Sequence, residues 1–165
     1  MMRLLYLFVL VPFAVTASEH YATSDAPQTA IQAYSHAARL VPLHASDEDT
    51  LRIWTRDYMS GQIRGHIITM VTSKSCLASS SYSNGSITIA RVRCNPSRKA
   101  PEVNEAIRAL PAFSRPEWNC PAFDGYEVFI EGVRRHKYFA IRVSNPQVCD
   151  DPESEAIVAL LGKLE

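Results

Sequence analysis

Two carboxylates spaced along one expected strand face, Glu127 and Glu131, are the first residues in this sequence that could do chemistry. Paired carboxylates hydrolyse glycosidic bonds when they lie about 5 to 9.5 Å apart across a sugar. Four residues along a strand separate two Cα atoms by about 13 Å, which is too far unless the side chains bend together. Arg142, expected opposite Glu127, supplies the charge for a cross-strand pair. We therefore interpret the glutamates as ion-pair partners.

Nucleophilic and metal chemistry have no signature in the sequence. Serines are numerous and five histidines are present, but no G-x-S-x-G elbow, H-E-x-x-H pair or phosphate-binding glycine loop occurs. His66 falls in a strand-like segment, where a structural role is commoner than a role as a base. Asp47 and Asp49 suggest a calcium loop, but the glycine and glutamate that such a loop needs are missing. The sequence predicts no catalytic residue, metal ligand or cofactor.

A basic cluster is the best candidate for a binding role. It is expected at the tip of a hairpin and comprises Arg134, Arg135, His136 and Lys137. A projecting loop on a rigid scaffold is a common way to contact a partner, although charged residues also make a turn soluble without binding anything. We predict that this tip engages another protein, together with the mixed strand face around Phe129 and Tyr138.

Four cysteines indicate a covalent framework. In an exported protein four cysteines most naturally form two disulfides, with three possible connectivities. Cys76 and Cys94 flank the strong turn signal Asn84-Gly85, while Cys120 and Cys149 flank the second hairpin. We predict the pairs Cys76–Cys94 and Cys120–Cys149, each contributing about 3 kcal/mol. Zinc binding and redox catalysis are disfavoured because the cysteines are widely spaced.

The first seventeen residues are expected to be a secretory signal peptide. Arg3 gives a positive start, and an apolar run from Leu4 to Val15 precedes Ala17. The run of about 12 residues is shorter than the roughly 20 that cross a bilayer, and no later stretch is apolar enough to span one. We predict cleavage after Ala17 and a mature domain, residues 18–165, in the periplasm or outside the cell.

The composition is that of an ordinary globular domain. The 165 residues are 47% apolar and 21% charged, with 17 basic and 17 acidic side chains. An unfolded region is less apolar than this, and a dedicated nucleic-acid binder carries an excess of Lys and Arg that counters phosphate. We therefore expect one folded domain that does not bind nucleic acid.

Helical spacing of apolar residues predicts three helices that could position these groups. They cover residues 25–40, 101–110 and the segment after residue 151. Asp25 stands two residues before Pro27, and Asp151 stands directly before Pro152. This is the pattern of a capping residue followed by a proline in the first turn of a helix. The proline-rich segment 111–125 is expected to be a loop.

Between the helices lie strand-like segments. Apolar and basic residues alternate over 51–56, which predicts an edge strand. The continuous apolar run over 67–72 predicts an interior strand. The Asn84-Gly85 turn then leads into a strand over 87–93.

The clearest hairpin joins residues 126–132 to residues 137–144. A turn centred on Arg134-Arg135 would place Val128 opposite Ile141 and Glu127 opposite Arg142. The apolar residues of the two strands then share one face. The second face is mixed enough to be expected in contact with solvent. Its residues are Glu127, Phe129, Glu131, Tyr138, Ala140 and Arg142.

Together these elements predict an α+β fold. It has an antiparallel sheet of about four to five strands with two hairpins, about three helices on one face, and two disulfides. Its size, export and disulfides resemble those of small bacterial periplasmic proteins, some of which inhibit hydrolases or act as immunity proteins. The leading hypothesis is an exported, non-catalytic protein of this kind that binds another protein. A small-ligand carrier and a small hydrolase are the alternatives, and the oligomeric state is left open.

Overall fold

The structure is a computed structural model that describes residues 25–43, 50–69, 72–83, 86–89, 92–97, 108, 110–134 and 137–164. The expected signal peptide, the loop with Asp47 and Asp49, and the helix expected over 101–110, apart from residues 108 and 110, lie outside this part. Within it, helix α1 (Asp25–Ala37), helix α3 (Pro152–Leu164) and the short 3-10 helix η2 (Pro146–Val148) accompany eight strands. The strands are β1 (Thr50–Asp57), β2 (Gln62–Thr69), β3 (Ser73–Ser83), β4 (Ser86–Ile89), β5 (Arg93–Pro96), β6 (Glu117–Asn119), β7 (Tyr126–Arg134) and β8 (Lys137–Ser144).

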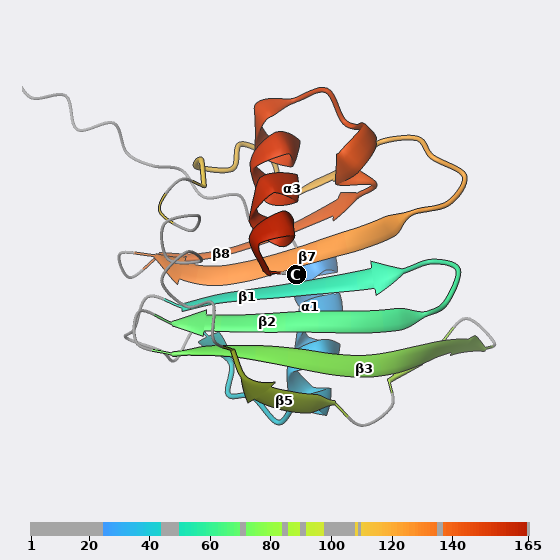
Figure 1. Cartoon of the computed structure of the whole chain (residues 1–165), viewed down its shortest axis with the longest axis vertical. Helices are drawn as coiled ribbons and strands as arrows, with labels where there is room; N and C mark the ends of the chain where they lie inside the picture. The colour runs from blue at the N-terminus through green and yellow to red at the C-terminus, as the bar shows by residue number, and fades with distance from the viewer. Residues whose placement is uncertain are drawn as a thin grey trace, which may run out of the picture.

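The strands form one sheet in the order β4-β3-β2-β1-β7-β8-β6, and β5 also pairs with β3 (Figure 1). All of these pairs are antiparallel except β6 with β8, which is parallel. The predicted α+β class with an antiparallel sheet is confirmed in outline, but four to five strands was too few. Strand β6 was missed because three residues between prolines are too short to show alternation.

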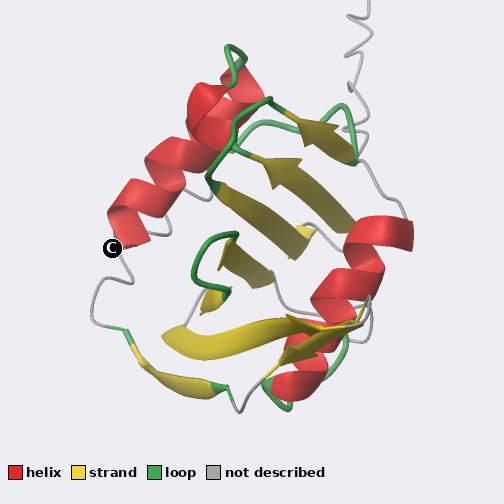
Figure 2. Ribbon diagram, turned by 90° about the vertical axis from the view of Figure 1, so that its right-hand side faces the viewer, coloured by secondary structure: helices red, strands yellow, loops and turns green. Residues whose placement is uncertain are grey.

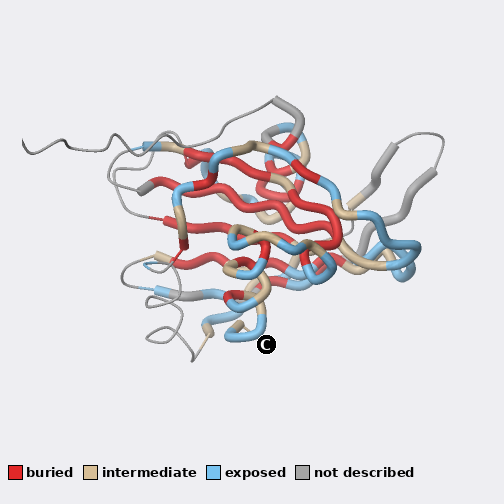
Figure 3. The backbone as a smooth tube through the Cα atoms, turned by 90° about the horizontal axis from the view of Figure 1, so that it is seen from above, coloured by how far each residue is buried: buried red, intermediate tan, exposed pale blue. Residues whose placement is uncertain are grey.

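The helices lie on opposite faces of the sheet, not on one face as predicted (Figures 1 and 2). On one face, Ile157 and Leu160 of α3 pack against Leu51, Ile130 and other apolar residues of β1, β7 and β8. On the other face, Ile31 and Tyr34 of α1 contribute to a second cluster. The central strands are therefore buried on both sides (Figure 3). No helix in the described segments is long and apolar enough to cross a bilayer.

Strand β1 is central in the sheet, which corrects the prediction of an edge strand. It pairs with β2 on one side and β7 on the other. Its alternating arginines suggested one solvated face, but Arg52 is 6% exposed because its guanidinium pairs with a glutamate under α1. Trp54 points to the same face and lies over Gly65 of β2, where a Cβ would overlap the indole.

The hairpin of β7 and β8 is present, but its register differs from the prediction by two residues. Val128 pairs with Val143, and Arg134 pairs with Lys137. A shift of two keeps every side chain on its face, so the apolar pattern could not distinguish the two registers. The expectation that the second face is exposed is wrong, because α1 covers it and leaves Phe129 3% exposed.

Both predicted disulfides are confirmed. Cys76 is bonded to Cys94, and these two residues are also cross-strand partners in β3 and β5. Cys120 is bonded to Cys149 and joins the end of β6 to the segment before α3. Ser83 pairs with Ser86, so the register of β3 and β4 agrees with a two-residue turn at 84–85, whose own residues lie outside the described part.

Candidate functional site

The two glutamates that first suggested catalysis lie in the interior under α1. Glu131 is 4% exposed, and its Oε1 accepts hydrogen bonds from Arg52 Nη1 at 3.1 Å and Ser35 Oγ at 3.1 Å. Arg52 Nη2 also donates to the carbonyl oxygen of Val41 at 2.6 Å. The guanidinium therefore ties β1 to β7 and to the chain that follows α1.

Glu127 is fully buried and lies between two arginines. Its Oε1 accepts from Arg142 Nε at 2.9 Å and also contacts Arg142 Nη2, while its Oε2 contacts Arg56 Nη2. Arg142 extends the chain of charges outward to Glu117, with Nη1 to Oε1 at 2.7 Å. The predicted contact between Glu127 and Arg142 is present, but the prediction that they face each other directly is wrong, because Glu127 pairs with Ser144 and Arg142 with Phe129.

Two tyrosines complete this buried cluster. Burial raises the pKa of Tyr138, and the neighbouring Glu131, which accepts a hydrogen bond from its hydroxyl at 3.3 Å, raises it further. Burial also raises the pKa of Tyr34, although Arg56 opposes the shift. Both phenols are therefore neutral at ordinary pH, and that of Tyr138 donates to Glu131. An arrangement in which each carboxylate is held by arginines in the interior is suited to fixing α1 on the sheet.

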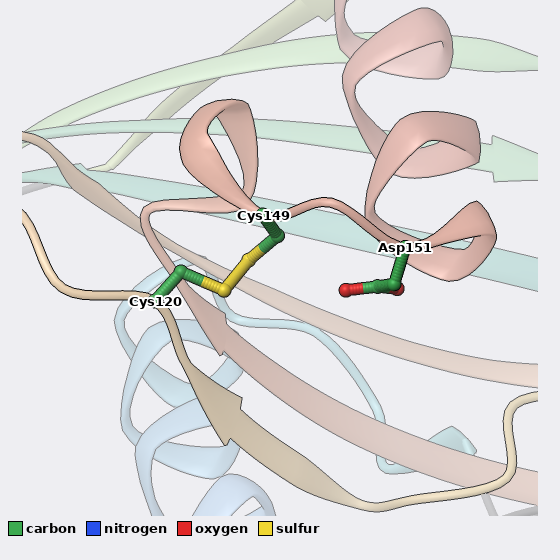
Figure 4. Close-up of side chains that lie close together, drawn as sticks. All are labelled: Cys120, Cys149 and Asp151. Carbon is green, nitrogen blue, oxygen red and sulfur yellow. A yellow bond between two sulfur atoms is a disulfide. The ribbon is translucent and has the colours of Figure 1, made fainter.

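A third cluster brings Cys120, Cys149 and Asp151 close together (Figure 4). Its sulfur atoms are bonded to each other, and a disulfide offers no thiolate to a metal ion. The carboxylate of Asp151 is also engaged, because Oδ1 accepts from the Ser154 N–H at 2.9 Å and Oδ2 from the Ser154 hydroxyl at 2.9 Å. Asp151 therefore caps the N-terminus of α3, and the cluster is not suited to hold a metal ion.

The predicted partner-binding residues are divided by the structure. Lys137 is exposed at the start of β8, whereas Phe129 packs edge-on against Tyr34 of α1 and cannot meet a partner. Tyr138 is half-buried. The backbone of Arg134 ends β7, while Arg135 and His136 lie outside the described residues. The role of the tip in binding stays a prediction.

Sequence reasoning missed an exposed aromatic residue at the opposite end of β7. Phe123 lies in the segment 121–124, which was treated as a simple loop, and its side chain is fully exposed. Met59, in the turn between β1 and β2, is 81% exposed. The two segments lie side by side, because the Tyr58 N–H donates to the Gly125 carbonyl at 3.0 Å (Figure 1, right). The available signal for this exposed residue was a phenylalanine between Pro121 and Asp124-Gly125, in a segment that follows Cys120.

Both ends of the 121–124 loop are fixed to the body of the protein. At its start, Cys120 is bonded to Cys149, its N–H donates to the Ser144 carbonyl at 3.1 Å, and its own carbonyl accepts from Asn145 Nδ2 at 2.9 Å. At its end, Gly125 packs so closely against Asn145 that a Cβ would overlap the amide. The loop therefore presents Phe123 from a rigid base.

Comparison of the chain with known protein families and with curated proteins finds no match.

Proposed function

We propose that this protein is an exported, non-catalytic binding protein whose partner is another protein. The observation that carries the proposal is the fully exposed Phe123 on a loop fixed at both ends. Two disulfides support export, because they persist in oxidising compartments. The buried glutamates do not favour the hydrolase alternative, since arginines occupy both of them.

The loop has the properties of an anchor for a protein interface. A large exposed aromatic residue gains most when a partner buries it in an apolar pocket. A loop that is already held in place loses little conformational entropy on binding. We define the binding end as Tyr58, Met59 and Phe123, the exposed apolar side chains on the two adjoining segments. The partner that we propose is a protein with an apolar pocket at its surface. Such a protein would be the target of an inhibitor or immunity protein.

The binding end and the basic hairpin tip are separate surfaces. Strand β7 starts next to Gly125 and ends at Arg134, so the two lie about 26 Å apart along the strand. A standard interface buries about 800 Å² on each partner, and one centred on Phe123 need not include the tip. Substitutions at each end can therefore be tested independently.

The test is capture of partners from an extract of the compartment into which the protein is exported. Residues 18–165 are immobilised with disulfides intact, as wild type and as Phe123→Ala. We expect a protein that the wild type retains and that Phe123→Ala loses. Val41→Ala is the matched control, because Val41 is 70% exposed and its carbonyl accepts a hydrogen bond from Arg52, six residues before Tyr58 on the chain.

The outcomes separate the possible surfaces. Loss of the partner with Arg134→Ala, Arg135→Ala and Lys137→Ala combined, but not with Phe123→Ala, would move the site to the hairpin tip. Retention by all variants, or capture of nothing in repeated trials, would overturn the proposal for both surfaces.

A further inference from the structure

Helix α3 covers one part of its sheet face, and β2, β3 and β5 extend beyond it (Figure 1). Two adjoining hollows lie along this boundary, with volumes of about 380 and 550 Å³, and both are lined by Arg64 and His66. Volumes of this size are typical of small-molecule sites. We name the two hollows together the α3 groove.

The strand register explains why the floor of the groove is basic. Arg64 pairs with Leu77, and Leu77 pairs with Arg93, so the three residues form one row across β2, β3 and β5. Strands are about 4.8 Å apart, which places the two arginine Cα atoms about 10 Å apart with Leu77 between them. His66 lies on the same face, two residues along β2. Two long guanidinium side chains can therefore reach one anion above Leu77.

The larger hollow is positively charged among the residues described around it. Its described lining includes Arg64 and Arg93, with the imidazole of His66 beside them, and contains no carboxylate. Asp57 borders the smaller hollow and is already engaged. Hydrogen bonds from the Ser60 N–H and hydroxyl hold the pKa of Asp57 below its usual value, and Arg64 adds to the shift.

The wall and part of the floor are apolar. Leu161 and Leu164 of α3 face the hollows, and Leu77 is 52% exposed on the floor. An apolar side chain left this exposed between two arginines is suited to a ligand that has an apolar body and a charged end. Arginine also binds carboxylate and phosphate oxygens with two parallel hydrogen bonds.

From these contacts we propose that the α3 groove binds an amphiphilic anion, with its head group between Arg64 and Arg93 and its chain along Leu77, Leu161 and Leu164. The smaller hollow borders the binding end, since Asp57 and Tyr126 line it, but the contacts proposed for the anion include none of Tyr58, Met59 and Phe123. A carboxylate head and a phosphate head are both compatible with two arginines. The experiment therefore includes one probe of each kind.

The test is isothermal titration of the protein alone, residues 18–165, with decanoate and with decyl phosphate below their micelle concentrations. We expect saturable binding of at least one of them. Decanol, which has no charge, and acetate, which has no chain, should each bind at least tenfold more weakly. Equal binding of decanol, or no binding of either anion, would overturn the proposal.

Variants locate the bound anion. Arg93→Ala should weaken binding at least tenfold, and Arg93 is an exposed residue of β5, so its loss leaves the core unchanged. Gly162→Trp should block the smaller hollow, because a Cβ at Gly162 meets no atom within 4 Å. Lys74→Ala is the matched control, since Lys74 is exposed on β3 with its side chain on the face opposite to Leu77. Binding unchanged in Arg93→Ala, or weakened equally in Lys74→Ala, would contradict the proposed site.

Discussion

At the scale of single residues, the interior under α1 depends on charges that are each matched by an opposite charge. Arg52 and Glu131 are 6% and 4% exposed and lie 3.1 Å apart. Removing one partner of such a pair leaves a buried charge without compensation, whereas replacing both by apolar residues can be close to neutral. Substituting one or both residues therefore tests whether these two side chains stabilise the folded protein as a matched pair.

We expect Glu131→Leu and Arg52→Met to lower the free energy of unfolding by about 3 to 5 kcal/mol each. The double variant should lose less than either single variant, because neither charge is then left alone. Urea unfolding of all four proteins measures this. Losses that simply add in the double variant would show that the two side chains are not coupled in the folded protein.

Asp151 gives stability a dependence on pH. Burial raises the pKa of Asp151, but hydrogen bonds from Ser154 and the charge of Arg115 outweigh burial and lower it overall. A lowered pKa in the folded state stabilises the protein above the unfolded-state value of about 3.9, and this stabilisation is lost as the pH falls through the folded-state pKa. We expect wild type to exceed Asp151→Asn in stability at pH 6 and the difference to shrink below pH 4. Unfolding by urea across this pH range is the measurement, with Asp150→Asn as the neighbouring control. A constant difference would be evidence against this role.

At the scale of elements, the features that depend on local sequence patterns were predicted well. The cap and proline at Asp151 locate the start of α3, and the turn signal at 84–85 together with the long hairpin led to both cysteine pairs. The hairpin register was not predictable, because a shift by two residues preserves the alternation of β7 and β8. The central place of β1 was missed because its arginines look solvated until their partners on β7 are known.

The two disulfides should differ in function although each stabilises the protein. Replacing either pair by serines is expected to cost about 3 kcal/mol by freeing the unfolded chain. Cys120–Cys149 also fixes one end of the 121–124 loop, whereas Cys76–Cys94 joins β3 to β5. Loss of the first pair should therefore weaken capture of the protein partner, and loss of the second should not. Folded material of both variants, checked by circular dichroism, is required for the comparison. Equal capture by the two would argue against a preorganised loop.

At the scale of the whole molecule, the sheet has two covered regions and two open ones. Helices α1 and α3 bury opposite faces over its centre, while the binding end and the α3 groove stay accessible. The sequence carried one local signal for the binding end, the phenylalanine between Pro121 and Asp124-Gly125, and none for the groove. The segments that carry Phe123 and Met59 are distant in sequence, and a backbone hydrogen bond between Tyr58 and Gly125 joins them. The groove forms where strands from three segments pass beyond a helix from a fourth, and no local pattern encodes such an arrangement.

The most direct test of the proposed protein interface is the affinity of the captured partner for wild type and for Phe123→Ala, measured by surface plasmon resonance. An aromatic anchor at the centre of an interface contributes about 2 kcal/mol or more, which corresponds to roughly a thirtyfold change in Kd. We predict a loss of at least that size for Phe123→Ala and an unchanged Kd for Val41→Ala. Equal affinity of the wild type and Phe123→Ala would contradict the account, because the exposed ring would then have no part in binding.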